Sequence, residues 1–205
     1  MGLRERKKEQ TRLAIEAAAF KLFAERGFAA TTISDIAAEA EIAPRTFFAY
    51  FPSKEDVVFA HFDGHEASLG QRLDERGPDE TTFDAIRVWI GEMLEATDTG
   101  EAERSAIRDT LVRENEGLQA HERHLMSRFE SLIAASVARD LGDHPDDLGP
   151  RLVAAAAIAA LTSLQPPDGK QHPPSSEDLA VLDEALAFLQ AGIAALQERR
   201  GATAA

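Results

Sequence analysis

The sequence predicts an all-α protein of about nine helices. Apolar residues recur every three or four positions through most of the chain, which is the period of a helix with one buried face. Glycine and proline interrupt this pattern, as at Gly27, Pro52 and Gly77, and no alternating strand pattern or internal repeat is present. At 205 residues and 44% hydrophobic content, the chain can hold one large domain or a small domain joined to a medium one. We expect these to be residues 1–52 and 53–205.

Each helix of the N-terminal part has its own start or stop signal. The first is predicted at about residues 7–26, and Gly27 is placed to end it as a left-handed cap. Thr32 and Asp35 form the capping box that opens the second helix. Pro44 suits the first turn of the third helix, because its missing N–H costs nothing there. The sequence therefore predicts three helices before residue 52.

The remaining helices are bounded in the same way. Ser53, with Asp56 three residues later, starts a long fourth helix that runs to about Arg76. Further helices are predicted at about residues 82–97, 102–115, 118–141, 148–164 and 176–199. The segment between the last two holds four prolines and is predicted to be an exposed loop.

The composition excludes several classes of protein. The chain has no cysteine, so disulfides, thiolate zinc sites and cysteine nucleophiles are excluded, and a reducing compartment is compatible. Arg12, Glu16 and Lys21 interrupt the apolar core that a secretion signal would need. The longest uncharged run, Leu152–Pro167, is shorter than the roughly 18 to 20 apolar residues that cross a bilayer. We expect a cytoplasmic protein with no membrane partner.

Charge is distributed unevenly along the chain. The net charge is −14, but residues 1–54 hold nine Lys or Arg against seven Asp or Glu. The remaining residues hold 13 basic and 29 acidic groups. Such asymmetry suggests one segment that meets a polyanion and an acidic body that is repelled by it. This pattern is compatible with DNA contact through the N-terminal end only.

Residues 31–56 point to a specific kind of DNA contact. They contain two short helices joined by a tight turn, with apolar positions at Ile33, Ile36, Ala37 and Ala40. Helices this short bury little surface on their own. A pair of this kind is typical of a helix-turn-helix, in which the second helix fits the DNA major groove. The sequence predicts a DNA-binding regulator.

The run Gly27–Val57, GFAATTISDIAAEAEIAPRTFFAYFPSKEDV, resembles the N-terminal signature of the TetR family of bacterial repressors. The shared features are a glycine and aromatic after the first helix, a Thr-Thr pair, Asp-Ile-Ala, a Thr-aromatic-aromatic recognition helix and a closing Phe-x-Ser-Lys-Glu. The resemblance covers about a quarter of the chain. It implies a homodimer that grips a palindromic operator, and a C-terminal domain that binds a small-molecule effector.

The resemblance also implies roles for single residues. Thr32, Tyr50 and Lys54 match positions that contact phosphate, the first from the start of a helix. Arg45 and Thr46 lie in the first turn of the recognition helix, the part that reaches base edges in this docking mode. A further group of basic residues is expected to form an N-terminal arm on the DNA backbone or in the minor groove: Arg4, Arg6, Lys7 and Lys8.

Three residues depart from the family pattern. Glu41 stands where glycine is usual in the turn, and a non-glycine residue with positive φ there is strained. Ala43 replaces a serine cap, and Phe48 replaces a tyrosine and lacks its phosphate hydrogen bond. We expect weaker or more ligand-sensitive operator binding. The alternative is a helical small-molecule binding protein whose DNA binding is weakened.

The last helix carries a wide apolar stripe. Its members are Leu179, Leu182, Leu186, Leu189, Ile193 and Leu196, with Val181, Ala185 and Phe188 alongside. In the family that the chain resembles, the final two helices pair with their mates as a four-helix bundle, and this stripe suits such a dimer interface. The alternative is that the stripe packs only within its own subunit.

Candidates for the effector pocket are large apolar residues on the middle helices: Phe62, Phe83, Trp89, Met93, Leu125, Phe129 and Leu161. Any one of them can equally be ordinary core. The region Val112–Leu161 resembles the C-terminal type of actinobacterial members, including the mycofactocin-associated regulator. This resemblance favours an apolar or acyl-type effector.

No catalytic or metal site is predicted. His61 and His65, and likewise His121 and His124, have spacings that place two imidazoles on one helix face, but no third ligand is identifiable. No nucleophile elbow or HExxH helix is present. We expect a protein that is not an enzyme and that needs no cofactor.

Overall fold

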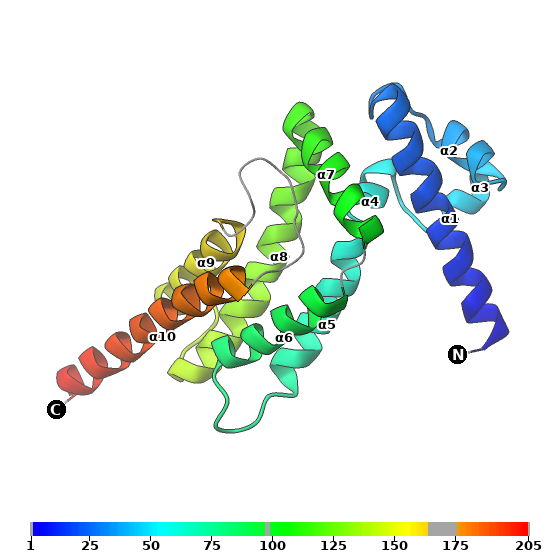
Figure 1. Cartoon of the computed structure of the whole chain (residues 1–205). Coiled ribbons are helices and arrows are strands. Elements are labelled where there is room, and N and C mark those ends of the chain that lie inside the picture. The colour runs from blue at the N-terminus through cyan, green and yellow to red at the C-terminus, as the bar shows by residue number, and fades with distance from the viewer. Residues whose placement is uncertain (1, 97–98, 164–175, 205) are drawn as a thin grey trace. The chain divides into compact units, whose positions relative to one another are not determined.

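The computed structural model describes residues 2–96, 99–163 and 176–204, and it is helical with no strand in that part of the chain (Figure 1). The all-α prediction is confirmed. In order, the helices are α1 (Leu3–Arg26), α2 (Ile33–Glu39), α3 (Pro44–Phe47), α4 (Lys54–Val58), α5 (Ala60–Asp74), α6 (Thr82–Ala96), α7 (Thr99–Glu114), α8 (Glu116–Leu141), α9 (Leu148–Ser163) and α10 (Ser176–Ala204). The proline-rich loop predicted before α10 lies outside the described residues.

The chain divides into two compact units. The first comprises Met1–Asp63 and Glu103–Glu122, and the second comprises Gly64–Ala102 and Arg123–Ala205. The first unit therefore takes in α4 and most of α7, and the predicted boundary after residue 52 falls inside it. Arg108 of α7 is 50 residues along the chain from Val58 of α4, which it contacts, so no local pattern marks α7 as part of this unit.

Local signals explain the start of each short helix. The Thr32 hydroxyl accepts from the Asp35 N–H at 3.1 Å, as the capping box predicts. The Ser53 hydroxyl accepts from the Asp56 N–H at 3.3 Å and so caps α4. Pro44 occupies the first turn of α3, also as predicted. At the end of α1, Gly27 has φ 78° but ψ 162°, so the predicted left-handed conformation is wrong although the positive φ is present.

The first helix begins earlier than predicted. It starts at Leu3 rather than at about residue 7, and the Gly2 N–H donates to the Glu5 carboxylate at 2.7 Å. Its buried face includes Phe20 and Phe23, whose rings meet edge-on at 6.1 Å. The basic residues at its start are exposed and helical, and their role as an arm on the DNA stays a prediction.

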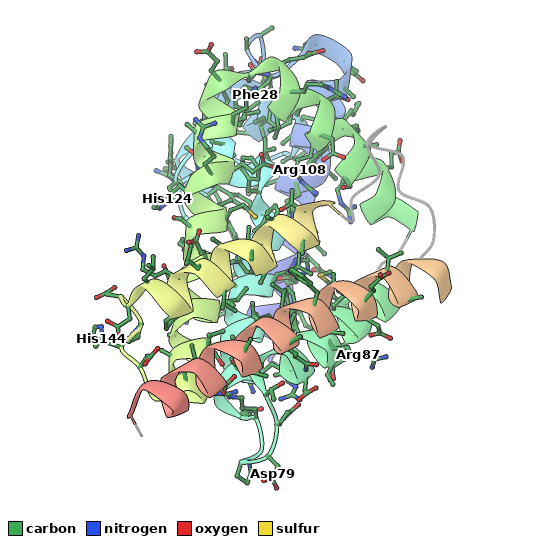
Figure 2. All side chains as sticks on the ribbon, turned by 90° about the vertical axis from the view of Figure 1, so that its left-hand side faces the viewer. Phe28, Asp79, Arg87, Arg108, His124 and His144 are labelled. Atoms are coloured by element: carbon green, nitrogen blue, oxygen red, sulfur yellow. The ribbon has the colours of Figure 1, made fainter. Side chains whose placement is uncertain are left out.

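The predicted long fourth helix is broken at Phe59. The Phe62 N–H donates to the Phe59 carbonyl at 2.9 Å, so it does not bond the Val58 carbonyl as a continuous helix requires. The Val58 carbonyl instead accepts from Arg108 Nε of α7 at 3.0 Å. Arg108 is only 6% exposed, and Figure 2 labels it. The buried guanidinium of Arg108 thus donates to the carbonyl that is left without a helical partner by the interruption at Phe59.

Two further side chains meet the same break. Arg12 of α1 donates to the Ala60 carbonyl at 2.7 Å. The His121 ring of α8 stacks on Phe59 with centroids 5.1 Å apart, and its Nε2 lies 3.8 Å from an Asp56 oxygen. We name this group, Arg12, Phe59, Arg108 and His121, the α4–α5 joint. A single continuous helix was the wrong prediction because these partners come from elsewhere in the chain.

The second unit is built from most of α5 and α8 together with α6, α9 and α10, around a buried apolar core. Helices α9 and α10 lie side by side, as both figures show. A polar cluster at the start of α6 ties it to α8: Thr82 donates to the Asp140 carboxylate from its N–H at 2.9 Å and from its hydroxyl at 2.6 Å. Arg76 pairs with the same carboxylate. Every predicted helix after residue 80 begins within three residues of its predicted start.

The turn between α2 and α3 carries the backbone strain that the sequence predicts. Glu41 has φ 54°, and among the described residues it is the only non-glycine residue with positive φ. Its side chain is exposed. For an L-residue this conformation costs roughly 1–2 kcal/mol, because the Cβ approaches the neighbouring backbone.

Glycine at this position removes the strain. We expect Glu41→Gly to raise the free energy of unfolding by up to about 1 kcal/mol, because the relief exceeds the extra entropy that glycine has in the unfolded chain. Urea unfolding measures the change. The matched control is Glu9→Gly in α1, which should lower stability by about 1 kcal/mol. If both variants lose stability, Glu41 is not strained.

Candidate DNA-binding site and partner surfaces

Buried aromatic rings fix the position of α3. Phe47 has 0% and Phe51 2% of its surface exposed, and their rings lie 6.0 Å apart. The residues after α3 form hydrogen bonds between positions three apart, as in a 3₁₀ turn. The Ala49 N–H donates to the Thr46 carbonyl, and the Tyr50 N–H donates to the Phe47 carbonyl. Ala43 offers no side-chain cap, as its residue type requires. The core therefore sets which side chains of α3 point outward.

The outward side chains include three of the predicted contacts. Arg45 is exposed, and its guanidinium has no hydrogen-bond or ion-pair partner among the described residues. Thr46 and Tyr50 are half-buried beside it in the sequence. Phe48 is 57% exposed, which is unusual for so large an apolar side chain. The basic residues Arg4, Lys7 and Lys8 are exposed on the first turns of α1.

The predicted phosphate contact at Thr32 already has an internal partner. The Thr32 N–H donates to the Asp35 carboxylate at 2.9 Å, and the hydroxyl donates to it at 2.5 Å. These hydrogen bonds hold the pKa of the Asp35 carboxyl below its ordinary value, so the group is anionic near neutrality. A phosphate must compete with this carboxylate for the same donors.

Lys54 is also engaged within the unit. Its Nζ donates to the carbonyls of Phe28 at 2.8 Å and Thr31 at 3.1 Å. The ammonium lies 4.2 Å from the centroid of the Phe28 ring. Lys54 thereby ties the start of α4 to the segment between α1 and α2. The family resemblance assigned Lys54 to a phosphate contact, which stays a prediction, and nothing local in the sequence marks residues 28 and 31 as its acceptors.

The predicted pocket residues fall into different environments. Phe83, Leu125 and Phe129 are at most 6% exposed and belong to the core, and Phe62 belongs to the first unit. The half-buried members are Phe62, Trp89, Met93 and Leu161. Sequence reasoning missed the polar partners of Trp89, whose Nε1 donates to the Ser68 hydroxyl at 2.8 Å. The His65 ring meets Trp89 edge-on at 6.2 Å.

The apolar stripe of α10 faces its own subunit. Leu182, Leu186, Leu189 and Ile193 are only 2–8% exposed, so they are not available to a partner chain. The side chains of Leu179 and Leu196 lie outside the described residues. The exposed apolar residues lie elsewhere on the last two helices: Leu148 (70%), Leu152 (59%), Val181 (46%) and Phe188 (77%). A partner surface on these helices must use this second set.

No three His, Asp or Glu side chains among the described residues converge as metal ligands would. None of the described helices is long and apolar enough to span a membrane.

The chain has a helix-turn-helix held by a small aromatic core and a larger helical unit. This combination is typical of DNA-binding transcriptional regulators. Residues 15–61 match the model of the bacterial regulatory proteins, tetR family, and residues 80–194 match the MftR C-terminal domain. The chain belongs to the TetR family, and its C-terminal part is of the MftR type, as the sequence resemblance predicted.

Known proteins agree with this assignment. The HTH-type transcriptional regulator TcmR of Streptomyces glaucescens is 33% identical over 164 residues, covering 75% of this chain and 71% of that protein. The fold resembles that of SmeT of Stenotrophomonas maltophilia in complex with triclosan (TM-score 0.59, 20% identity, 87% and 91% of the two chains). It also resembles Thermus thermophilus FadR in complex with lauroyl-CoA (TM-score 0.52, 23% identity, 88% and 94%).

Salt dependence distinguishes the two roles of Lys54. We expect Lys54→Met to lower the free energy of unfolding by about 1–2 kcal/mol, because two carbonyls lose a charged donor. The slope of log affinity against log salt on a mixed-sequence duplex should stay unchanged, since no phosphate contact is lost. As a control, Lys8→Met on exposed α1 should flatten that slope by about 0.9 per subunit. The same flattening in Lys54→Met would assign Lys54 to a phosphate.

Proposed function

We propose that the protein is a ligand-responsive repressor that binds a palindromic operator as a homodimer and is released by a small apolar or acyl-type effector. The DNA contacts lie within residues 1–52, and residues 53–205 bind the effector and the second subunit. The observation that carries the proposal is α3 itself, whose buried Phe47 and Phe51 leave Arg45 exposed without an internal partner.

The outward residues of α3 suit base and backbone contacts. Arg45, with Thr46 beside it, reaches base edges, and the guanidinium fork matches the two acceptors of guanine. Tyr50 contacts a phosphate, and Arg4, Lys7 and Lys8 approach the backbone from the first turns of α1. Thr32 and Lys54 act on DNA through their internal bonds, which hold the ends of α2 and α4.

The homodimer forms through the exposed apolar residues of α9 and α10. Phe188 is 77% and Leu148 70% exposed. Large apolar side chains that are exposed on two adjacent helices indicate a surface that binds another protein chain. The family to which the chain belongs supports dimerisation by the last two helices. Each subunit then presents one α3 to one half of the operator.

The effector binds in the second unit near Trp89. This ring is half-buried and lies 6.5 Å from that of Phe129, and its indole N–H is fixed by Ser68. Met93 and Leu161 are half-buried candidates on neighbouring parts of the same unit. Triclosan, found in the SmeT complex, is largely apolar, and lauroyl-CoA, found in the FadR complex, carries an apolar acyl chain, which supports an apolar or acyl-type ligand here.

Release requires a link between effector and α4. Helix α5 begins in the first unit and continues into the second, so a shift of α5 acts on the α4–α5 joint. Effector binding then tilts α4 and changes the separation of the two α3 copies from about one helical repeat, roughly 34–36 Å. A tenfold preference of the effector for the released state corresponds to about 1.4 kcal/mol.

The second candidate is a helical small-molecule binding protein with weakened DNA binding. Two observations favour it: Glu41 holds an exposed carboxylate in a strained turn beside α3, and Asp35 occupies the donors of Thr32. Both acidic groups oppose the approach of phosphate.

Selection of bound duplexes from a random pool separates the two candidates. We expect enrichment of a palindromic sequence whose half-sites lie one helical turn apart, because two symmetry-related α3 helices read it. A pool that stays random at low salt would favour the small-molecule binding protein. The Arg45→Ala variant should enrich a consensus that is relaxed at one position of each half-site.

The dimer surface has its own test. Phe188→Asp should halve the mass measured by light scattering at micromolar concentration, because a buried carboxylate opposes association. The side chain is 77% exposed in the single chain, so the subunit itself stays folded. The control is Val88→Asp, an exposed apolar position on α6 (41%) that should leave the mass unchanged. A dimeric Phe188→Asp protein would remove this surface from the proposal.

A further inference from the structure

Phe48 is an exposed aromatic ring at the end of α3. It is 57% exposed, while its neighbour Phe47 is fully buried. The two rings meet edge-on, with centroids 5.6 Å apart and planes at 84°. Phe48 has helical backbone angles, φ −67° and ψ −11°, so it continues the path of α3. The buried ring of Phe47 therefore restricts where the exposed ring can point.

Most groups on the surface of a DNA duplex form hydrogen bonds, which a phenyl ring cannot provide. Phosphates need hydrogen-bond donors, and the base edges of the major groove present mainly donors and acceptors. The distinct apolar group there is the 5-methyl of thymine. An exposed phenylalanine on the element that meets DNA therefore matches one feature of the groove.

We propose that Phe48 reads the 5-methyl group of a thymine in each operator half-site. The inference rests on the proposed function, because it requires α3 to lie in the major groove. Methyl burial against the ring gives a preference of about fourfold for thymine over a base that lacks the methyl, from the transfer free energy of one methyl-sized group. The specificity comes from shape and solvation, with no hydrogen bond.

The position of Arg45 locates this thymine. Arg45 and Phe48 are three residues apart in helical conformation, so their Cβ atoms are neighbours on one face, about 5–6 Å apart. Base pairs are stacked about 3.4 Å apart. A guanine bound by Arg45 and the thymine bound by Phe48 therefore lie within about two base pairs of each other.

The test is a double-mutant cycle that removes the thymine methyl from the DNA and the Phe48 ring from the protein, separately and together. The probe is the palindromic duplex obtained by selection, with each candidate thymine replaced by deoxyuridine, which lacks only the methyl. With the wild-type protein, one position per half-site should lose about fourfold in affinity, and replacement in both half-sites should lose about 16-fold. With Phe48→Ala, the same replacement should have no effect.

Two controls separate the contact from general damage. Phe48→Tyr keeps the ring and should keep the sensitivity to deoxyuridine. A thymine outside the half-sites should tolerate the replacement in all three proteins. Because the side chain is exposed, Phe48→Ala should also keep the wild-type melting temperature, so loss of folding does not enter the comparison.

The outcomes distinguish this inference from the proposed function. A palindromic consensus that wild-type protein binds equally with thymine or deoxyuridine overturns the role of Phe48 and leaves the repressor intact. Sensitivity to deoxyuridine that persists in Phe48→Ala assigns the methyl to another residue. A pool without any consensus overturns both.

Discussion

The arrangement of helices in the first unit depends on the interruption between α4 and α5, where side chains from other helices donate hydrogen bonds to the freed carbonyl groups. At Phe59 the chain leaves the helical path, and the Val58 carbonyl is taken by the buried guanidinium of Arg108. A cation at the carboxyl end of α4 also meets the negative end of its helix dipole. A buried charge needs such acceptors, and a buried carbonyl needs such a donor, so each stabilises the other. Residues 103–122 consequently belong with the helix-turn-helix, and the direction of α4 depends on α7.

The cations of the first unit divide into those used internally and those available to DNA. Arg12 bonds the Ala60 carbonyl, Lys54 bonds two carbonyls, and Lys21 pairs with Glu39 at 2.5 Å. The carboxylate of Glu39 raises the pKa of Lys21. Within residues 1–54, the exposed cations without an ion pair are few: Arg45 on α3 and the basic residues at the start of α1. Attraction to a polyanion therefore comes from a few positions, which a net count over residues 1–54 does not convey.

Local chemistry was predictable from the sequence, and long-range choices were not. The caps at Thr32 and Ser53, the proline of α3 and the positive φ at Glu41 each depend on residues within a few positions. The break at Phe59 depends on residues 12 and 108, which no local pattern connects to it. The last helix carries apolar residues on more than one face, so periodicity alone did not decide which face is buried. Packing turns Leu182 and Leu186 inward and leaves Phe188 outside. For the same reason the sequence did not show that Phe83 and Leu125, named as pocket candidates, are almost fully buried.

The charge at the α2–α3 turn bears on the proposed release of DNA by a ligand. The backbone strain of Glu41 is already present in the free protein and therefore acts on folding stability, whereas its exposed carboxylate would repel the DNA backbone in the proposed complex. A regulator that binds DNA with a large excess of free energy needs a strongly selective effector to release it. One whose DNA-binding turn already opposes the complex needs an effector with a smaller preference. In the proposed repressor, an acidic turn that lowers the affinity for DNA would lower by the same amount the preference that an effector needs to release it.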